Sequence, residues 1–135
     1  MRLPRKAEIG VFSRYGWSDG KTESWAFTQI DRSLSGAISS GGRSWKRPLD
    51  RVGNAAVRNY LSGDQRSFLA AGGVGFLVGD GRLNYRHESI IETYYAWKAA
   101  KDFTVSLDHQ RVANPAYNRD RGLVNAESLR LHRER

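Results

Sequence analysis

A strict alternation of side-chain type runs through residues 92–110, "ETYYAWKAAKDFTVSLDHQ", and it limits the folds open to this chain. Successive side chains of a β-strand point to opposite faces, so alternation predicts one apolar and one polar face. The apolar set is Thr93, Tyr95, Trp97, Ala99, Phe103, Val105 and Leu107. The polar set is Glu92, Tyr94, Ala96, Lys98, Thr104, Ser106, Asp108 and Gln110.

These two stretches predict a β-hairpin with a three-residue loop at 100–102. That loop places Ala99 opposite Phe103, Trp97 opposite Val105 and Tyr95 opposite Leu107, so that pattern and register agree. The aromatic residues gather toward the turn, as in the aromatic girdle of a membrane barrel. Cross-strand aromatic pairs of a soluble sheet have the same pattern, and the hairpin alone favours the soluble sheet.

The remainder of the chain also favours strands joined by turns. Strands are expected at 9–17, at 23–39 with a bulge near Asp31, at 51–59 and at 123–132. Residues 62–73, "SGDQRSFLAAGG", predict one or two helical turns that Asp64 caps and Gly72 or Gly73 ends. The expected fold class is therefore all-β, with about six antiparallel strands and a short helix in a long loop.

The predicted connections alternate in length. Short links fall at 40–50 and 100–102, longer ones fall at 60–88 and 112–122, and a short link at 18–23 departs from this order. Outer-membrane barrels have short turns on one side and long loops on the other. Such a barrel is compatible with the polar mean hydropathy of −0.62, because only every second strand residue faces lipid.

Charge and composition restrict the functions further. Lys and Arg number 22 against 14 acidic residues, a net charge of +8. Such a balance suggests a nucleic-acid partner, but the bases form no recognisable nucleic-acid-binding motif, and solvated or lumen-facing charge is the favoured interpretation. The chain has no Cys, which excludes disulfides and thiolate chemistry. "MRLPRKAEIGVF" lacks the apolar run of a signal peptide.

No motif indicates catalysis, a metal or a cofactor. The glycines of "GGVGFLVGDG" lack the spacing and the following helix of a nucleotide-binding loop. His87, His109 and His132 are too scattered for a metal site. Glu88 and Glu92 lack an accompanying nucleophile, and we expect no enzyme activity. The polar face of 92–110, in contrast, mixes donors, acceptors and an aromatic plane, which suits a sugar as well as an ordinary solvated sheet.

Three long strings of the sequence resemble a known family. They are "GVFSRYGWSDGKTESWAFTQIDRSLSGAIS", "YLSGDQRSFLAAGGVGFLVGDGRLNYRHESIIETYYAWK" and "VSLDHQRVANPAYNRDRG". They resemble the C-terminal part of the OprB-type carbohydrate-selective porins of Gram-negative outer membranes, and "GDGRLNYR" and "ANPAYNRDRG" are the most specific pieces. The resemblance implies an antiparallel outer-membrane barrel of about sixteen strands. It also implies passive diffusion of sugars through a water-filled lumen, without a cofactor or covalent catalysis.

Within that resemblance, residues 1–135 are the C-terminal portion of the barrel, and parity assigns side chains to its two faces. The expected partners are sugars, outer-membrane lipid and the remainder of the barrel, with no nucleic acid. Lumen-facing residues are predicted to be Arg14, Glu92, Tyr94, Lys98, Asp108, Gln110 and Arg130. Lipid-facing residues are predicted to be Tyr15, Trp17, Tyr95, Trp97, Phe103, Val105 and Leu107.

The sequence also departs from the family pattern. No export signal precedes it, and "LRLHRER" lacks the terminal aromatic residue of these porins and puts Arg133 and Arg135 on the lipid side. Asn54 and Arg58 fall on a face expected to be apolar. Six strands cannot close a sixteen-strand barrel, so the chain is expected to be a fragment that forms an incomplete barrel. The alternative is a soluble, basic β-rich module that binds nucleic acid or another polyanion.

Overall fold

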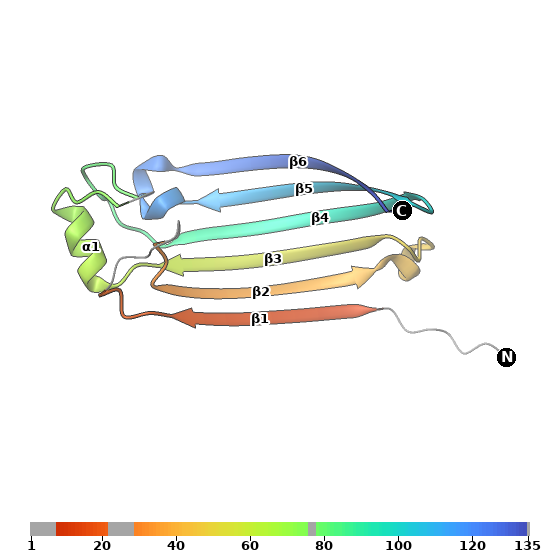
Figure 1. Ribbon diagram of the computed structural model, residues 1–135, viewed down its shortest axis with the longest axis horizontal. Helices are drawn as coiled ribbons and strands as arrows, with labels where there is room; N and C mark the ends of the chain where they lie inside the picture. The colour runs from red at the N-terminus through yellow and green to blue at the C-terminus, as the bar shows by residue number, and fades with distance from the viewer. Residues whose placement is uncertain (1–7, 22–28, 76–77, 135) are drawn as a thin grey trace.

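The computed structural model describes residues 8–21, 29–75 and 78–134. Six strands form one antiparallel sheet in which every strand pairs with its neighbour in sequence (Figure 1). This architecture confirms the all-β class and the six predicted strands. The strands are β1 (Ile9–Trp17), β2 (Arg32–Gly41), β3 (Arg51–Tyr60), β4 (Glu88–Ala100), β5 (Phe103–Ala113) and β6 (Leu123–Arg133). Short helices are η1 (Gly42–Trp45), α1 (Gly63–Ala70), η2 (Pro115–Tyr117) and η3 (Arg119–Arg121).

The strand register divides the sheet into two faces, because directly opposed residues of paired strands share a face. One partner row runs from Ser40 through Val52, Tyr95 and Leu107 to Leu129. We call the side that carries this row the apolar face. The opposite side, which carries Glu92 and its partner Gln110, is the polar face. Large apolar side chains concentrate on the first of these faces, at Ile9, Val11, Tyr15, Trp17, Leu34, Ile38, Ile91, Trp97, Leu107, Leu123, Leu129 and Leu131.

The apolar face is open. Val11 is 78% exposed and Leu107 is 62% exposed, and many of their apolar neighbours exceed 40%. The buried apolar residues instead cluster in the connections at the end of the sheet where α1 lies (Figure 1). A soluble sheet of this kind buries its apolar face against a second layer. The buried hydrophobic residues of this cluster are Leu61, Leu69, Val78 and Tyr117.

The central hairpin of β4 and β5 forms as the alternation predicted. Trp97 opposes Val105 and Tyr95 opposes Leu107, which confirms that part of the register. The predicted pair of Ala99 and Phe103 is wrong, because the register shifts between Lys98 and Ala100, and Ala100 becomes the partner of Phe103. The irregularity shortens the turn to residues 101–102.

The extended stretch expected at 23–39 is only partly a strand. Residues 22–28 lie outside the described residues, and β2 begins at Arg32 with an unbroken register to Gly41. The bulge predicted near Asp31 is therefore absent from the described part of this stretch. Asp31 instead joins three segments: its carbonyl accepts from Ser18 N at 2.6 Å, its N–H donates to Tyr60 O at 3.1 Å, and its carboxylate accepts from Ser62 N at 2.6 Å.

The predicted helical turns form α1, but Asp64 does not cap it. Ser62 occupies the N-cap position, and its hydroxyl accepts the backbone N–H of Gln65 at 3.2 Å. Asp64 lies in the first turn, where its charge favours the helix dipole. The helix ends before Gly72, whose φ of 92° is readily adopted by glycine. No helix in the described ranges has the length and apolar character required to cross a membrane.

Connections alternate between the two ends of the sheet, as an antiparallel order of neighbouring strands requires. The long links at 61–87 and 114–122 lie at the α1 end, and the links at 42–50 and 101–102 lie at the opposite end (Figure 1). Of the short link predicted at 18–23, residues 22 and 23 lie outside the described residues, and residues 18–21 follow β1 at the α1 end. The links at 42–50 and 114–122 are both nine residues long, so only the links at 61–87 and 101–102 show the predicted contrast in length.

Candidate functional site

Polar side chains from three adjacent strands meet on the polar face. In β4 and β5, Glu92 opposes Gln110 and Tyr94 opposes Asp108, and Asp108 in turn opposes Ser128 of β6. Gln110 Nε2 donates to Glu92 Oε2 at 3.0 Å. Together these groups border a hollow of about 320 Å³, which is lined by Glu92, Tyr94, Ser106, Asp108, Gln110, Ser128 and Arg130.

A second hollow continues the first one toward β1. Its volume is about 280 Å³, and its lining includes Phe12, Ser39 and Ala55. Glu92 and Tyr94 line both hollows. The pair therefore lies at the junction of the two hollows on the polar face, with charged groups on one side and Phe12 among small side chains on the other.

Gly53 makes room for the Tyr94 ring at this junction. The two residues are direct partners in β3 and β4. A Cβ atom placed on Gly53 would lie 2.3 Å from Tyr94 Cε1, closer than such atoms approach one another. The ring consequently lies against the backbone of β3. The sequence singled out Tyr94 but missed Gly53, which only the register identifies as its partner.

Of the residues predicted to face a lumen, the structure brings five together around the first hollow: Glu92, Tyr94, Asp108, Gln110 and Arg130. Lys98 is on the same face but near the turn, where its Nζ lies 3.2 Å from Glu134 Oε2. Arg14 is also on this face, in β1, three strands away from β4. Sequence reasoning did not select Ser106 and Ser128, although both have the parity of the other lining residues.

The residues predicted to face lipid all share the apolar face. Tyr15 and Trp17 project from β1 near the α1 end and are 67% and 63% exposed. The others belong to the hairpin, where Trp97 and Leu107 are exposed. The remaining members of the set are half-buried, namely Tyr95, Phe103 and Val105.

Polar residues interrupt this face where the sequence suggested. Asn54 opposes Ile38 and Thr93, and Arg58 opposes Leu34 and Ser89, so both lie on the apolar face. Arg133 opposes Phe103 on the same face. Arg135, which parity placed beside it, lies outside the described residues.

A polar cluster that sequence reasoning missed fixes the turn end of the sheet. Asp50 is 3% exposed, and its carboxylate accepts bonds from Arg47, from the Tyr95 hydroxyl at 2.6 Å and from Lys98 N at 3.0 Å. Trp45 Nε1 donates to the same Tyr95 oxygen at 3.2 Å. The bond from Arg47 in particular lowers the pKa of Asp50. The cluster anchors the 42–50 turn to β4.

The string "ANPAYNRDRG" folds toward the polar face at the α1 end. Glu88 Oε2 accepts the backbone N–H of Ala116 at 2.9 Å, and Glu88 Oε1 accepts from Asn59 Nδ2 at 3.1 Å. Tyr117 has a φ of 62°, and its hydroxyl donates to Gln29 O at 2.8 Å. Burial raises the pKa of the Tyr117 phenol. This string is therefore a structural element that closes over the edge of the polar face.

The charged groups that the structure describes form no recognisable metal centre. Among residues 8–21, 29–75 and 78–134, His, Asp and Glu side chains form no group of three or more that could hold an ion. The polar face instead offers hydrogen-bonding groups, a ring and open space. These are the components of a binding or passage surface.

A single-layer antiparallel sheet with an exposed apolar face and a polar opposite face is the architecture of a membrane β-barrel wall. Comparison with protein families agrees: the model of the carbohydrate-selective porin, OprB family, matches residues 2–131. The chain belongs to the OprB family of carbohydrate-selective porins. Comparison with curated proteins and with solved structures found no significant match.

Family membership has consequences for location and activity. The family consists of transport channels rather than enzymes. Membership of the family implies an outer-membrane location, and the family name specifies carbohydrates as the solutes. The resemblance of the sequence to this family is thereby confirmed over nearly its whole length.

Proposed function

We propose that this sheet forms part of the wall of a water-filled channel through which sugars diffuse passively across the outer membrane. The observation that carries the proposal is the separation of the two faces. The apolar side chains are open to the surroundings, while the polar side chains converge on hollows that Tyr94 and Glu92 join. A lipid-facing exterior and a hydrated interior suit both faces at once, which supports the proposal.

The positions of the aromatic residues support a membrane-spanning depth. Tyr60 lies at the α1 end of β3, and Tyr95 lies opposite Val52 of the same strand near the turn end. The stretch from Val52 to Tyr60 spans about 27 Å at about 3.4 Å per residue. With a strand tilt of about 40°, it crosses about 20 Å of membrane, which approaches the apolar band of about 25 Å between the two aromatic girdles of such barrels.

Open strand edges support closure by further strands. The sheet ends at β1 and β6, each of which pairs on one side in the described structure. Unpaired backbone N–H and C=O groups in hydrocarbon cost several kcal/mol each, so an open arc is unstable there. We therefore propose that additional strands pair with these two edges and complete the barrel, of which residues 1–135 form the C-terminal portion.

The chemistry of the polar face suits a neutral sugar. Hydroxyl groups both donate and accept hydrogen bonds, and Glu92, Gln110 and Arg130 provide acceptors and donors along one path. The Tyr94 ring provides an apolar plane against which the C–H face of a sugar ring packs. Such dispersed, weak contacts select sugars without retaining them, which passive passage requires.

Liposome swelling tests the function directly. The protein, purified from outer membranes, is reconstituted and exposed to isotonic solutions of hexoses, amino acids or salts. We expect faster swelling with hexoses than with amino acids of similar size. Equal rates for the two solute classes would remove the claim of sugar selectivity, and the absence of swelling would remove the channel itself.

A further inference from the structure

Three arginines share the apolar face at the α1 end of the sheet. Arg32 begins β2, Arg58 lies two residues before the end of β3, and Arg111 lies two residues before the end of β5. These ends of the three strands all lie on the side of α1 (Figure 1). The direct partners that place the arginines on the apolar face are, in the same order, Trp17, Leu34 and Ile91. We call the three residues the arginine group.

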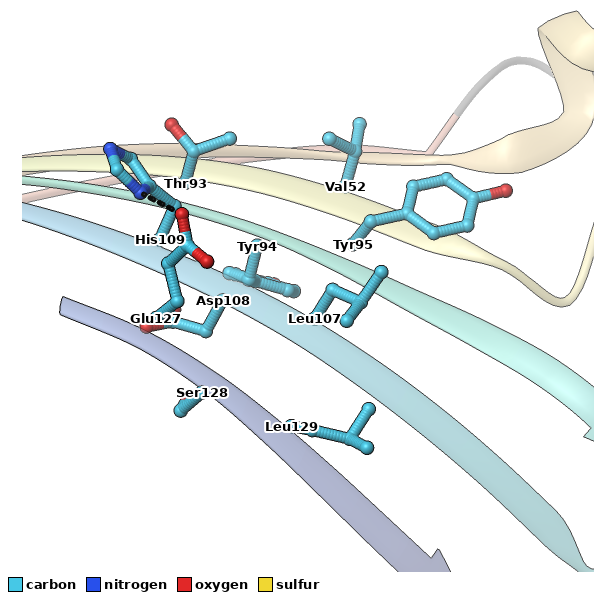
Figure 2. Close-up of a pocket in the computed structure, with 10 residues that line it drawn as sticks. All are labelled: Val52, Thr93, Tyr94, Tyr95, Leu107, Asp108, His109, Glu127, Ser128 and Leu129. Carbon is cyan, nitrogen blue, oxygen red and sulfur yellow. Dashed lines mark ion pairs between the residues drawn. The ribbon is translucent and has the colours of Figure 1, made fainter.

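The arginine group lacks a carboxylate partner among the described residues. All three residues are exposed, and no ion pair within residues 8–21, 29–75 and 78–134 includes them. Glu127 of β6 is a diagonal neighbour of Arg111, but it pairs with His109, whose Nδ1 lies 3.7 Å from Glu127 Oε1 (dashed line in Figure 2). The other residues of this face within three positions of the same strand ends are uncharged, namely Tyr15, Trp17, Leu34, Tyr60, Ser89, Ile91, Ala113, Leu123 and Asn125.

Two members of the group are close enough to share one anion. Arg58 is two residues from Tyr60, the direct partner of Arg32, so Arg32 and Arg58 are diagonal neighbours. Such positions lie about 7–8 Å apart, which long side chains easily bridge. Two guanidinium groups at this separation repel each other, and the repulsion grows where the surroundings are apolar. An anion between them replaces this repulsion by two attractions.

The third arginine lies two strands further along the sheet. Strands are about 4.8 Å apart, so Arg111 of β5 is displaced from Arg58 of β3 by about 10 Å across the strands. Only the short side chains of Ser89 and Ala113 follow Arg58 in its partner row over this interval. The arginine group therefore offers two cationic positions on either side of a shallow surface, which suits a ligand with two separate anionic groups.

The arginine group also lies at the level expected for lipid headgroups. Outer-membrane barrels place their longer loops outside the cell, and the connection at 61–87 leaves the sheet at this end. Tyr15 and Trp17 lie on the same face within two residues of the end of β1, and aromatic residues are enriched at membrane interfaces. An arginine side chain packs its methylene stem on apolar surface while its charged end reaches toward water. In the proposed channel, the three guanidinium groups thus meet the headgroups of the outer leaflet.

We propose that the arginine group binds the headgroup of an outer-leaflet lipid that bears two phosphates. Guanidinium groups pair with phosphate oxygens through charge-assisted hydrogen bonds that are often bidentate. One phosphate lies between Arg32 and Arg58, and the other lies at Arg111. The exposed side chains of Leu34 and Ile91 then contact the acyl chains. A free phosphate ion would satisfy the charges but would leave these apolar side chains uncovered, so the chemistry of the surface favours a lipid.

Binding of defined lipids to the purified protein tests the site. Native mass spectrometry in neutral detergent compares lipid A that carries both phosphates with the same lipid after removal of both, in the presence of EDTA so that no divalent cation bridges protein and phosphate. We expect the unsubstituted protein to bind the phosphorylated form at least about tenfold more tightly, because charge-assisted bonds are lost with the phosphates. Excess inorganic phosphate should not displace the bound lipid.

A pair of double variants separates the arginine group from net charge. Arg32→Gln with Arg58→Gln removes two members of the group, and we expect it to weaken binding of phosphorylated lipid A about tenfold. Arg14→Gln with Arg133→Gln removes the same charge from the polar face and from the turn end of the apolar face, and we expect it to leave that affinity unchanged. Equal losses in the two double variants would reduce the effect to net charge and overturn the site.

Two further outcomes would contradict the inference, and neither depends on whether a variant folds. Equal affinity of the unsubstituted protein for phosphorylated and dephosphorylated lipid A would overturn the phosphate contact. Displacement of the lipid by inorganic phosphate would show that the site takes a free anion rather than a lipid.

The inference rests on the proposed orientation of the sheet, which a separate measurement tests. The chain contains no Cys, so a fluorophore on Val11→Cys reports on one position of the apolar face. We expect brominated lipid to quench this label in the reconstituted protein. An unquenched label would overturn the orientation and, with it, this inference. Quenching without preferential binding of phosphorylated lipid A would overturn the lipid site alone and leave the proposed channel intact.

Discussion

The ring of Tyr94 lies against Gly53, its direct partner across β3 and β4. A methyl group at position 53 would meet the ring carbon Cε1 at 2.3 Å. The position of the ring thus depends on the absence of a side chain in the neighbouring strand. This relationship connects a single glycine to the aromatic surface that the proposed channel offers to sugars.

Replacing the ring should weaken sugar interaction. Tyr94→Ala removes an apolar plane, and the loss of about 40 Å² of contact at about 25 cal/mol/Å² amounts to about 1 kcal/mol. The half-blocking sugar concentration in single-channel current recordings should therefore rise about fivefold. Tyr94→Phe keeps the plane and serves as the control. An unchanged half-blocking concentration in Tyr94→Ala would show that the ring does not contact the sugar.

Gly53→Ala tests the support of the ring without altering the ring itself. The added Cβ must displace Tyr94 from the backbone of β3. We expect a change in open-channel conductance and a weaker sugar block. Val57→Ala, on the same face of β3 but outside the linings of the two hollows, is the matched control and should leave both unchanged. Identical recordings from Gly53→Ala and the unsubstituted protein would contradict the close approach.

Neutralising Asp50 should loosen the turn end of the sheet. Asp50 accepts bonds from Arg47, Tyr95 and Lys98, and hydrogen bonds to a charged group contribute about 1.5–3 kcal/mol. Asp50→Asn should lower the free energy of unfolding in urea by about that amount. Asp102→Asn, which is exposed in the neighbouring turn, should have little effect. Equal losses in the two variants would exclude a special role for Asp50.

Acid should release the loop between β5 and β6 from the loop between β3 and β4, because Arg121 of the first loop donates to Asp80 of the second. Hydrogen bonds from Arg121, and next from Asn118, lower the pKa of Asp80. Because the folded-state pKa lies below the unfolded value of about 3.9, the stabilisation is present above about pH 4 and disappears as the pH falls through the folded value. The Arg121 Nε–H resonance should lose its protection in that window. Asp80→Asn should abolish this acid transition, and a transition of unaltered size would refute the assignment.

Ser62, rather than Asp64, should control the stability of α1. Loss of an N-cap hydroxyl costs about 1 kcal/mol, which corresponds to about fivefold weaker protection of the helix amides. Ser62→Ala should therefore accelerate hydrogen exchange at Leu69 more than Asp64→Ala does, since Asp64 contributes only its interaction with the helix dipole. A larger effect of Asp64→Ala would reverse the assignment of the cap.

Alternation in the hairpin was enough to predict its two faces and most of its register. The pairs of Trp97 with Val105 and Tyr95 with Leu107 follow from a period of two residues, which a one-residue slip would invert. The turn itself was predicted wrongly. A shift between Lys98 and Ala100 changes the pairing locally without altering the alternation of the side chains before it, so the pattern contains no sign of it.

Long-range pairings were harder to predict than local ones. The contact of Asp50 with Tyr95 joins residues 45 positions apart and depends on how the 42–50 turn folds over β4. Ser62 and Asp64 are both good capping residues, and the bond from Ser62 N to Asp31 decides between them by fixing the chain before the helix. Neither the contact of Asp50 with Tyr95 nor the choice of Ser62 as the N-cap could be predicted before the pairing of the strands was known.

Solvent accessibility at two adjacent positions of β5 tests the central claim most directly. Spin labels are placed singly at Leu107→Cys and Asp108→Cys in the reconstituted protein, and collisions with oxygen, which concentrates in lipid, and with a water-soluble nickel complex are compared. The account predicts that oxygen collisions dominate at position 107 and nickel collisions dominate at position 108. Equal accessibility at the two positions, or the reverse order, would contradict a sheet with one face toward lipid and the other toward water.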